Sequence, residues 1–294
     1  MECFVDTTGD CQFVSLGKFL DRSDKVGDVE VYRCKHCGHG ISIPPLPDAA
    51  FLYEGRESQD YQPGTKGLAH AIKDLAFHSQ ARKLIRQIGD PPGTILDFGC
   101  GSGQFTRVLG ELVGTSTVFG ADMHPDSPPD LKNTQYLGPS ELPAHQGGFD
   151  TVLALHVLEH DDDAARLLST IASYARNGGK VVIEVPNINC TWSKLFGKYW
   201  DAWYLPFHRH HFNKESIISL IQRNNLDIES VHNVTVPTMG RSFANIFKKS
   251  NNAFWLVCGG IAHPIQLAGE FITHQPSAIR VIAKKNAIQP SSPR

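Results

Sequence analysis

The sequence lacks an excess of charge of either sign, because its 28 Lys and Arg residues nearly balance its 30 Asp and Glu residues and the formal net charge is −2. Phosphate binding normally shows as a basic excess, so this balance argues against a nucleic-acid partner. The chain has 294 residues, of which 41% are hydrophobic and 20% charged, a composition typical of a packed globular protein. This length accommodates one large α/β domain and a small appendage.

Long apolar runs are also missing. The segment 254–272 comes nearest, but Pro264 and Glu270 interrupt it, and no segment reaches the ~20 apolar residues that a transmembrane helix needs. Met1–Asp6 has no basic stretch followed by an apolar one, so we expect no secretory signal and predict a cytoplasmic location. In that compartment the seven cysteines are better interpreted as thiols or metal ligands than as disulfides.

Short apolar segments alternate with helical patterns through the middle of the chain. This alternation predicts an α/β fold with a doubly wound, mostly parallel sheet buried between helices. The expected strands are 94–98, 117–121, 149–155, 180–185, 226–234 and 278–285, and the expected helices are 65–89, 104–113, 163–176 and 214–224.

A change in composition near Pro47 divides the chain into parts. Residues 1–47 are rich in Cys and end in a Pro-rich connector, which predicts a small Cys-containing appendage. Residues 48–285 form the predicted main domain, with lid or substrate elements at about 187–215 and 239–274. Residues 286–294 are predicted to be a flexible tail.

A glycine-rich loop, Ile95–Gln104 (ILDFGCGSGQ), connects a predicted strand to a predicted helix. Its glycines allow positive φ and a close approach to the backbone, and the helix start offers free N–H groups and a positive dipole end. A pyrophosphate or the carboxylate of an amino-acid-like cofactor suits such a site. Asp122 follows the next strand, where a carboxylate can accept hydrogen bonds from ribose hydroxyls. Together these features predict a cofactor site rather than a structural turn.

The loop resembles the cofactor motif of class I methyltransferases, which use S-adenosyl-L-methionine (SAM). Phe149–His160 resembles their fourth-strand segment, and Gly178–Asn187 resembles their fifth strand. The resemblance implies a seven-stranded, Rossmann-like sheet whose last strand is antiparallel. Nicotinamide binding is the rival for any such loop, and the leading acid favours SAM. The resemblance assigns the cofactor to ten residues: Asp97, Gly99, Cys100, Gly101, Ser102, Gly103, Gln104, Asp122, Met123 and Leu155.

A cluster of His and acidic residues follows the predicted strand 149–155. At helical spacing His156, Glu159, His160 and Asp163 share one face. Such a face can bind a divalent metal, supply a general base, or act only in packing and capping. The cluster resembles the acid-rich segment of ubiquinone-pathway O-methyltransferases, which use a metal there, although His156 replaces a usual acid.

A second group of histidines, His208 to His211, precedes the helix expected at 214–224. Many small-molecule methyltransferases carry a His near their substrate pocket in a similar segment, so this group adds candidates. Together the two groups give His156, His160, His208 and His211 as predicted catalytic residues. The surrounding aromatic side chains are either an apolar lid over the acceptor or ordinary core; they are Trp192, Phe196, Tyr199, Trp200, Trp203, Tyr204 and Phe207.

Near the N-terminus, Cys34 and Cys37 have the Cys-x2-Cys spacing of a zinc knuckle, followed by Gly38. The segment resembles the zinc-ribbon-like domain that precedes some small-molecule methyltransferases. Cys3 and Cys11 complete four predicted ligands for a structural Zn2+, although they lack the Cys-x2-Cys spacing. Reduced cysteines in a metal-free fold are the alternative.

These patterns predict SAM-dependent methyl transfer to an oxygen or nitrogen of a small, fairly apolar acceptor. Three alternatives stay open: an RNA methyltransferase with a zinc knuckle, a lipid C-methyltransferase, and a SAM-binding scaffold without catalysis. Neither the identity of the acceptor nor the oligomeric state follows from these motifs.

Overall fold

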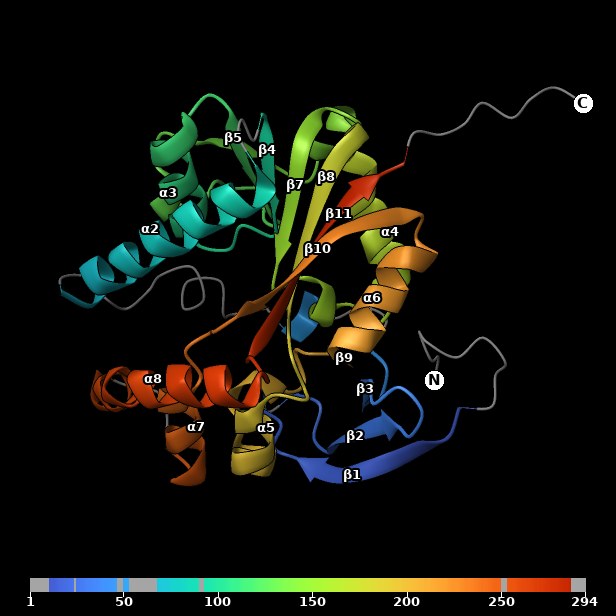
Figure 1. Ribbon diagram of the computed structural model, residues 1–294, viewed down its shortest axis with the longest axis vertical. Coiled ribbons are helices and arrows are strands. Elements are labelled where there is room, and N and C mark those ends of the chain that lie inside the picture. The colour runs from blue at the N-terminus through green and yellow to red at the C-terminus, as the bar shows by residue number, and fades with distance from the viewer. Residues whose placement is uncertain are drawn as a thin grey trace, which may run out of the picture.

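The computed structural model describes residues 11–23, 25–46, 50–52, 68–89, 93–249 and 253–286. Two sheets organise these residues (Figure 1). A central sheet has seven strands in the order β10-β11-β8-β7-β4-β5-β6, and an N-terminal sheet has four in the order β1-β2-β3-β9.

The central sheet confirms the predicted fold class. Strands β4 to β8 pair in parallel, whereas β11 is antiparallel to both of its neighbours, β8 and β10. The strands are β4 (Ile95–Phe98), β5 (Val118–Ala121), β6 (Gln135–Leu137), β7 (Phe149–Leu155), β8 (Ala175–Pro186), β10 (Leu226–Val234) and β11 (Ala278–Lys285).

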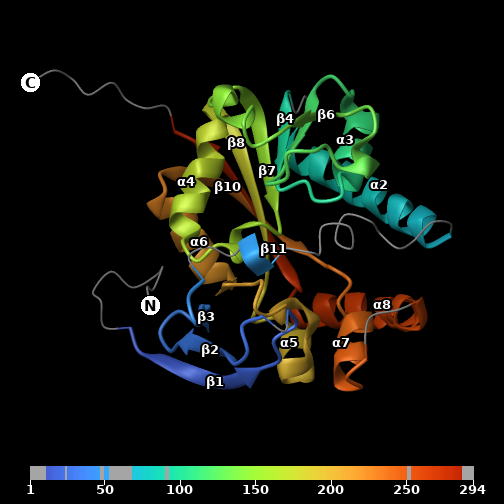
Figure 2. The same ribbon diagram turned by 180° about the vertical axis from the view of Figure 1, so that it is seen from behind.

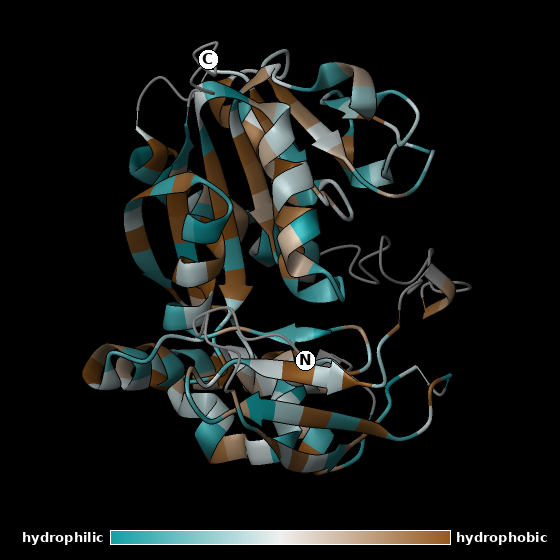
Figure 3. Ribbon diagram, turned by 90° about the vertical axis from the view of Figure 1, so that its right-hand side faces the viewer, coloured by the Kyte–Doolittle hydropathy of each residue, from teal (hydrophilic) through white to brown (hydrophobic). Residues whose placement is uncertain are grey.

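Helices cover both faces of this sheet, which is why its middle strands are mostly apolar and buried. One face packs against α2 (Leu68–Ile88) and α3 (Gln104–Val113), and the other against α4 (Ala164–Tyr174) and α6 (Lys214–Arg223) (Figure 1). The apolar colour follows the strands of this layer in Figure 3. Burial of each Val, Leu or Ile there contributes roughly 1.5–3 kcal/mol to the free energy of unfolding.

The N-terminal sheet is antiparallel and is completed by a distant segment. Its strands are β1 (Phe13–Phe19), β2 (Val29–Cys34), β3 (Gly40–Ile43) and the two-residue β9 (His210–His211). Its core includes most of the aromatic side chains that the sequence offered as a lid, namely Trp192, Phe196, Trp200 and Trp203. These four are buried core residues. The boundary predicted at residue 47 and the tail at 287–294 lie outside the described residues.

Three further helices complete the fold: α5 (Thr191–Phe196), α7 (Met239–Ile246) and α8 (Ala253–Thr273). Figures 1 and 2 place them beside the N-terminal sheet, at the end of the central sheet toward which the β7 arrow points. None of the helices in the described ranges is long and apolar enough to cross a membrane.

Candidate active site

The glycine loop forms the turn between β4 and α3. Gly99, Gly101 and Gly103 have φ values of +77°, +56° and +76°, in a region of backbone conformation that residues other than glycine rarely adopt. A Cβ on Gly103 would lie 2.7 Å from the Cβ of Leu131, whereas a Cβ on Gly101 would meet nothing within 4 Å. The loop is therefore packed at Gly103 and open beside Gly101, where a ligand has room.

Asp122 follows β5 and fastens the loop from the neighbouring strand. Its Oδ2 accepts a hydrogen bond from the backbone N–H of Gly101 at 2.9 Å, and its Oδ1 accepts one from Met123 at 2.8 Å. The Met123 side chain is exposed. Asp122 thus holds the backbone of Gly101 from the end of β5, and the contacts of Asp122 with a ribose and of Met123 with an adenine stay predictions.

Asp97 is buried within β4, just before the loop. Burial raises the pKa of its carboxyl to about 6, although Oδ2 accepts a hydrogen bond from the Thr106 hydroxyl at 2.6 Å. Gln104 begins α3, and its Nε2 donates a hydrogen bond to Oδ1 of Asp74 on α2 at 3.0 Å. An ionised Asp97 would gain from a nearby cation.

The segment after β7 does not form the single helical face expected from its spacing. His156 has a left-handed backbone with φ +58°, Leu158–His160 is a 3-10 turn, and Asp163 caps α4 by accepting a hydrogen bond from the Arg166 N–H. Asp163 therefore has a structural role at the start of α4, and the prediction of one helical face was wrong.

His156 is held between two carboxylates. Its Nδ1 lies 3.3 Å from Oε1 of Glu159, and its Nε2 lies 3.1 Å from Oε1 of Glu184 on β8. Desolvation lowers the pKa of this imidazole, but the bonds to Glu159 and Glu184 outweigh it and raise the pKa to about 10. His156 is consequently an imidazolium at neutral pH, and both of its nitrogens are donors.

Arg280 on β11 completes this charged network. Its Nε and Nη2 lie 2.8 and 2.6 Å from Oε2 of Glu184, which faces it directly in the β8–β11 register. These residues were not predicted, yet the sequence carried a signal. Glu184 and Arg280 are charges inside the apolar runs 181–185 and 278–283, and a buried charge needs a partner.

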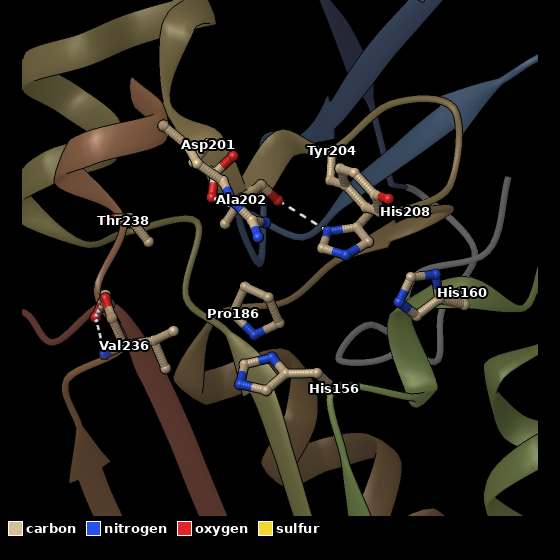
Figure 4. A pocket seen from close by; sticks show the side chains of 11 residues that line it. His156, His160, Pro186, Asp201, Ala202, Tyr204, His208, Val236 and Thr238 are labelled. Atoms are coloured by element: carbon tan, nitrogen blue, oxygen red, sulfur yellow. Dashed lines mark hydrogen bonds and ion pairs between the residues drawn. The ribbon is translucent and has the colours of Figure 1, made fainter. Parts of the chain in front are cut away.

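A cavity of about 230 Å³ opens beside His156 (Figure 4). Its walls come from the segment after β7, from the loop before β9, and from the start of α7. The lining residues are His156, His160, Pro186, Asp201, Ala202, Tyr204, His208, Val236, Thr238, Arg241 and Ser277. Most of them are polar, and Thr238 keeps a buried hydroxyl oxygen without a hydrogen-bond partner.

His208 presents one ring nitrogen toward this cavity. Its Nδ1 lies 2.8 Å from the Ala202 carbonyl oxygen, which can only accept, so Nδ1 carries the proton and Nε2 does not (Figure 4). Burial, together with nearby His160 and His211, keeps the pKa of His208 well below its ordinary value. His208 is therefore neutral at neutral pH.

The two predicted groups of histidines meet at this point. The His160 and His208 rings are 4.7 Å apart, centroid to centroid, and Nε2 of His208 lies 3.9 Å from Oε1 of Glu159. Ligand atoms of Glu159, His160 and His208 lie within 4.8 Å of one another, close enough to share a metal ion. The sequence placed Glu159 and His160 together but did not join His208 to them.

The cavity and the glycine loop share one wall. A Cβ on Gly99 would lie 2.5 Å from Cγ2 of Val157, so the loop backbone rests directly on the residue that follows His156. The cofactor loop and the cavity therefore both adjoin the same short segment, residues 156–160.

A protein-family model described as a methyltransferase domain matches residues 68–231, more than half of the chain. The chain belongs to this methyltransferase family. Among curated proteins, this methyltransferase is 29% identical over 126 residues to trans-aconitate 2-methyltransferase of Deinococcus radiodurans, covering 40% of this chain and 47% of that protein. It is 26% identical over 132 residues to ubiquinone biosynthesis O-methyltransferase of Rhodopseudomonas palustris, covering 41% and 51%. The chain spans about half the length of the curated relatives it matches.

Solved structures show the same fold as this methyltransferase. The 1,6-didemethyltoxoflavin-N1-methyltransferase of Burkholderia thailandensis, solved with S-adenosylhomocysteine (SAH), is 17% identical with a TM-score of 0.52, covering 85% of this chain and 96% of that one. A chain from the complex that contains the Haloferax volcanii Trm112 methyltransferase activator is 14% identical with a TM-score of 0.53, covering 81% and 97%.

One predicted catalytic residue of the methyltransferase, His211, is not among the residues that line the cavity. His211 is buried in β9, where its Nε2 is 2.9 Å from the Ser42 hydroxyl and burial lowers its pKa to about 3. Arg209 is also buried and clamps the segment, since its side chain binds Asp162 at 2.8 Å and the Ser42 carbonyl at 3.0 Å. These contacts attach the N-terminal sheet to the cavity wall.

Three of the predicted zinc ligands lie together in the N-terminal sheet. Cys34 ends β2, its Sγ is 3.3 Å from Sγ of Cys11, and the Cys37 N–H points at it from 3.5 Å. Burial raises the pKa of the Cys34 thiol, but hydrogen bonds from Cys37 and Cys11 lower it by a larger amount, so the pKa falls below its ordinary value to about 7. Cys3, the fourth predicted ligand, lies outside the described residues.

Proposed function

We propose that this protein transfers a methyl group from SAM to an oxygen or nitrogen of a small acceptor bound in the cavity beside His156. The contact between Gly99 and Val157 carries the proposal, because it sets the cofactor loop against the segment whose residues His156 and His160 line the cavity. Binding donor and acceptor next to each other would remove much of the entropic barrier to transfer.

The cofactor loop fits SAM in shape and charge. The open side of Gly101 leaves room for the amino-acid part, and the free N–H groups at the start of α3 suit its carboxylate. In this proposal Asp97 receives the ammonium group, Asp122 receives the ribose, and Met123 receives the adenine. Cys100, Ser102, Gln104 and Leu155 belong to the same turn and strand ends and stay predicted contacts. When bound, SAM supplies an electrophilic methyl group on a sulfonium.

The cavity favours an acceptor with polar groups. Thr238 has an unpartnered buried hydroxyl oxygen there, and Arg241 lies at its edge with Asp201 3.9 Å away. Most of the aromatic residues predicted to form a lid are core residues, and Tyr204 is the one that lines the cavity. A small acceptor that hydrogen-bonds to these groups fits better than the fairly apolar molecule expected from the aromatic content.

His208 is the residue proposed to take the acceptor's proton. Its Nε2 has a free lone pair because Nδ1–H is engaged by Ala202, and it faces the cavity. As Nε2 gains a proton, the Glu159 carboxylate at 3.9 Å stabilises the imidazolium. His156 cannot share this role, since it is already protonated between Glu159 and Glu184.

Replacing His208 with alanine tests this assignment. We expect turnover with a metabolite extract, followed as SAH release and a one-methylene mass gain, to fall by roughly 10²–10⁴-fold. The dissociation constant for SAM, measured by calorimetry, should not change. Unchanged SAH release would refute the role of His208. Loss of turnover in wild-type protein after chelation would instead assign Glu159, His160 and His208 to a metal ion.

We also propose that Cys3, Cys11, Cys34 and Cys37 hold a structural Zn2+. The support is the 3.3 Å distance between the Cys11 and Cys34 sulfurs, the contact from the Cys37 N–H to Cys34 Sγ, and the Cys-x2-Cys spacing that is typical of a thiolate zinc site. The ion would cross-link the N-terminal sheet and would take no part in the reaction in the cavity.

A further inference from the structure

The cavity beside His156 has a polar end at the start of α7. Thr238 immediately precedes that helix and lines the cavity, and it is only 3% exposed. Its hydroxyl oxygen has no hydrogen-bond partner within the described part of the chain. A threonine at this position usually caps a helix by accepting a hydrogen bond from one of its first N–H groups, but Thr238 makes no such bond. The hydroxyl group and the N–H groups of the first turn, which have no partner inside a helix, are therefore donors that a ligand can use.

Arg241 adds positive charge to this end of the cavity. Its side chain lines the cavity and is 58% exposed, and its Nη1 lies 3.9 Å from Oδ2 of Asp201, beyond hydrogen-bond distance. Asp201 is bound more closely by Arg22, whose Nη1 lies 3.1 Å from Oδ1. Two guanidinium groups thus share one carboxylate, and the N-terminus of α7 adds a partial positive charge. This end of the cavity therefore favours a ligand group with a single negative charge.

The other end of the cavity carries the histidines near which the proposed methyl transfer takes place. Figure 4 shows Thr238 on one side of the cavity and His160 and His208 on the other. His156 also lines the cavity, but both of its ring nitrogens face carboxylates of the protein, at 3.3 and 3.1 Å. A bound acceptor would therefore have an anionic group near Thr238 and its methyl-accepting atom near His208.

We propose that the end of the cavity at α7 binds a carboxylate of the acceptor, through Thr238, Arg241 and the first N–H groups of the helix. This inference rests on the proposed methyl transfer, which makes the cavity the acceptor site. A carboxylate offers several acceptor positions and one negative charge, whereas a phosphate monoester carries about two charges at neutral pH. A cationic acceptor would meet Asp201 at this end, which Arg22 already engages. The bound carboxylate positions the acceptor and does not itself receive the methyl group.

Chemically treated metabolite extracts test the class of the acceptor. The full chain is incubated with SAM and with an extract whose carboxyl groups have been converted to amides by carbodiimide and ammonia, or with a mock-treated extract. We expect SAH release with the mock-treated extract and at least tenfold less with the amidated one, because an amide has no charge for Arg241 to attract. Phosphatase treatment of the extract should leave SAH release unchanged. Loss of release after phosphatase treatment would overturn the proposal in favour of a phosphate group.

Paired variants connect the carboxylate to the residues that bind it. Arg241→Gln and Thr238→Val should each raise the amount of extract that gives half-maximal SAH release by about tenfold, with a smaller change in the maximal rate. Arg176→Gln and Thr134→Val are matched controls and should keep both wild-type values. Arg176 is 55% exposed and pairs with an aspartate at the end of β8 far from Pro186, and Thr134 is buried with a hydroxyl oxygen that also lacks a partner.

Folding is checked by the melting temperature of each variant. The Thr238 hydroxyl has no partner for the protein to lose, so Thr238→Val should melt no lower than the wild type. A lower melting temperature together with an unchanged half-maximal amount of extract would show that the hydroxyl serves the fold instead of the acceptor.

A binding measurement without turnover separates this inference from the proposed function. The protein is incubated with SAH and untreated extract and passed over a size-exclusion column, and the small molecules that it retains are identified by mass spectrometry. We expect retained carboxylic acids that are depleted in Arg241→Gln and not in Arg176→Gln. Such retention without SAH release from SAM would refute methyl transfer and support the carboxylate site. SAH release that survives amidation, or the absence of any retained acid that depends on Arg241, would overturn the carboxylate site.

Discussion

Replacing Gly101 with alanine probes the space beside the cofactor loop. A Cβ at this position meets no protein atom within 4 Å, so the methyl group changes no packing in the protein. The backbone φ of +56° disfavours alanine by about 1 kcal/mol, which lowers the free energy of unfolding. Gly147 provides a control with the same two properties, since its φ is +69° and its Cβ would also meet nothing.

The two variants should lose similar stability and differ in cofactor binding. Urea unfolding should show a loss of about 1 kcal/mol for both Gly101→Ala and Gly147→Ala. Calorimetry with SAM and SAH should show at least a tenfold weaker affinity for Gly101→Ala, about 1.4 kcal/mol, because its methyl group occupies the space meant for the ligand. Gly147→Ala should keep the wild-type affinity.

Wild-type cofactor affinity in Gly101→Ala would refute this reasoning. It would mean that the open side of Gly101 faces solvent rather than ligand. A loss of affinity shared by both variants would instead trace to the backbone strain alone.

Two further predictions concern ionisable groups. Burial raises the pKa of Asp97 to about 6, and the ammonium group of SAM favours its ionised form. SAM affinity should therefore rise with pH through about 6 and be roughly tenfold weaker at pH 5 than at pH 7.5. The SAM affinity of Asp97→Asn, measured by calorimetry, should not change over this pH range. If the affinity of the variant also rises with pH, another group causes the pH dependence. Cys34→Ser should reduce bound zinc, measured by mass spectrometry of the metal, from about one equivalent to near none, and it should lower the melting temperature. Cys258→Ser should change neither the zinc content nor the melting temperature. Wild-type protein that contains no zinc would contradict the site.

The parallel core could be predicted from the sequence because its signals are local. Strands β4, β5 and β7 and the second half of β8 are mostly apolar, and the glycine loop marks the turn between β4 and α3. The number of seven strands and the antiparallel β11 followed from the family resemblance. The short strand β6 has one buried residue, Leu137, and so gave no comparable pattern.

The cavity could be predicted only in part, because tertiary contacts assemble it. His160 and His208 were recognised separately, but the contact between their rings depends on the loop before β9. Thr238 and Arg241 belong to a segment whose placement the sequence did not indicate. His156 seemed an ordinary base candidate, and its neighbours Glu159 and Glu184 turn it into a fixed cation instead.

The pairing of β3 with β9 has a consequence for the order of folding. Gly40 pairs with His211, so the N-terminal sheet cannot close until most of the chain has been synthesised. Until then, the edge of β3 and the valines of β2 lack their partners. Docking of β9 also sets the loop that carries Tyr204 and His208. The acceptor cavity is therefore assembled late, after the strands that form the cofactor loop can already pair.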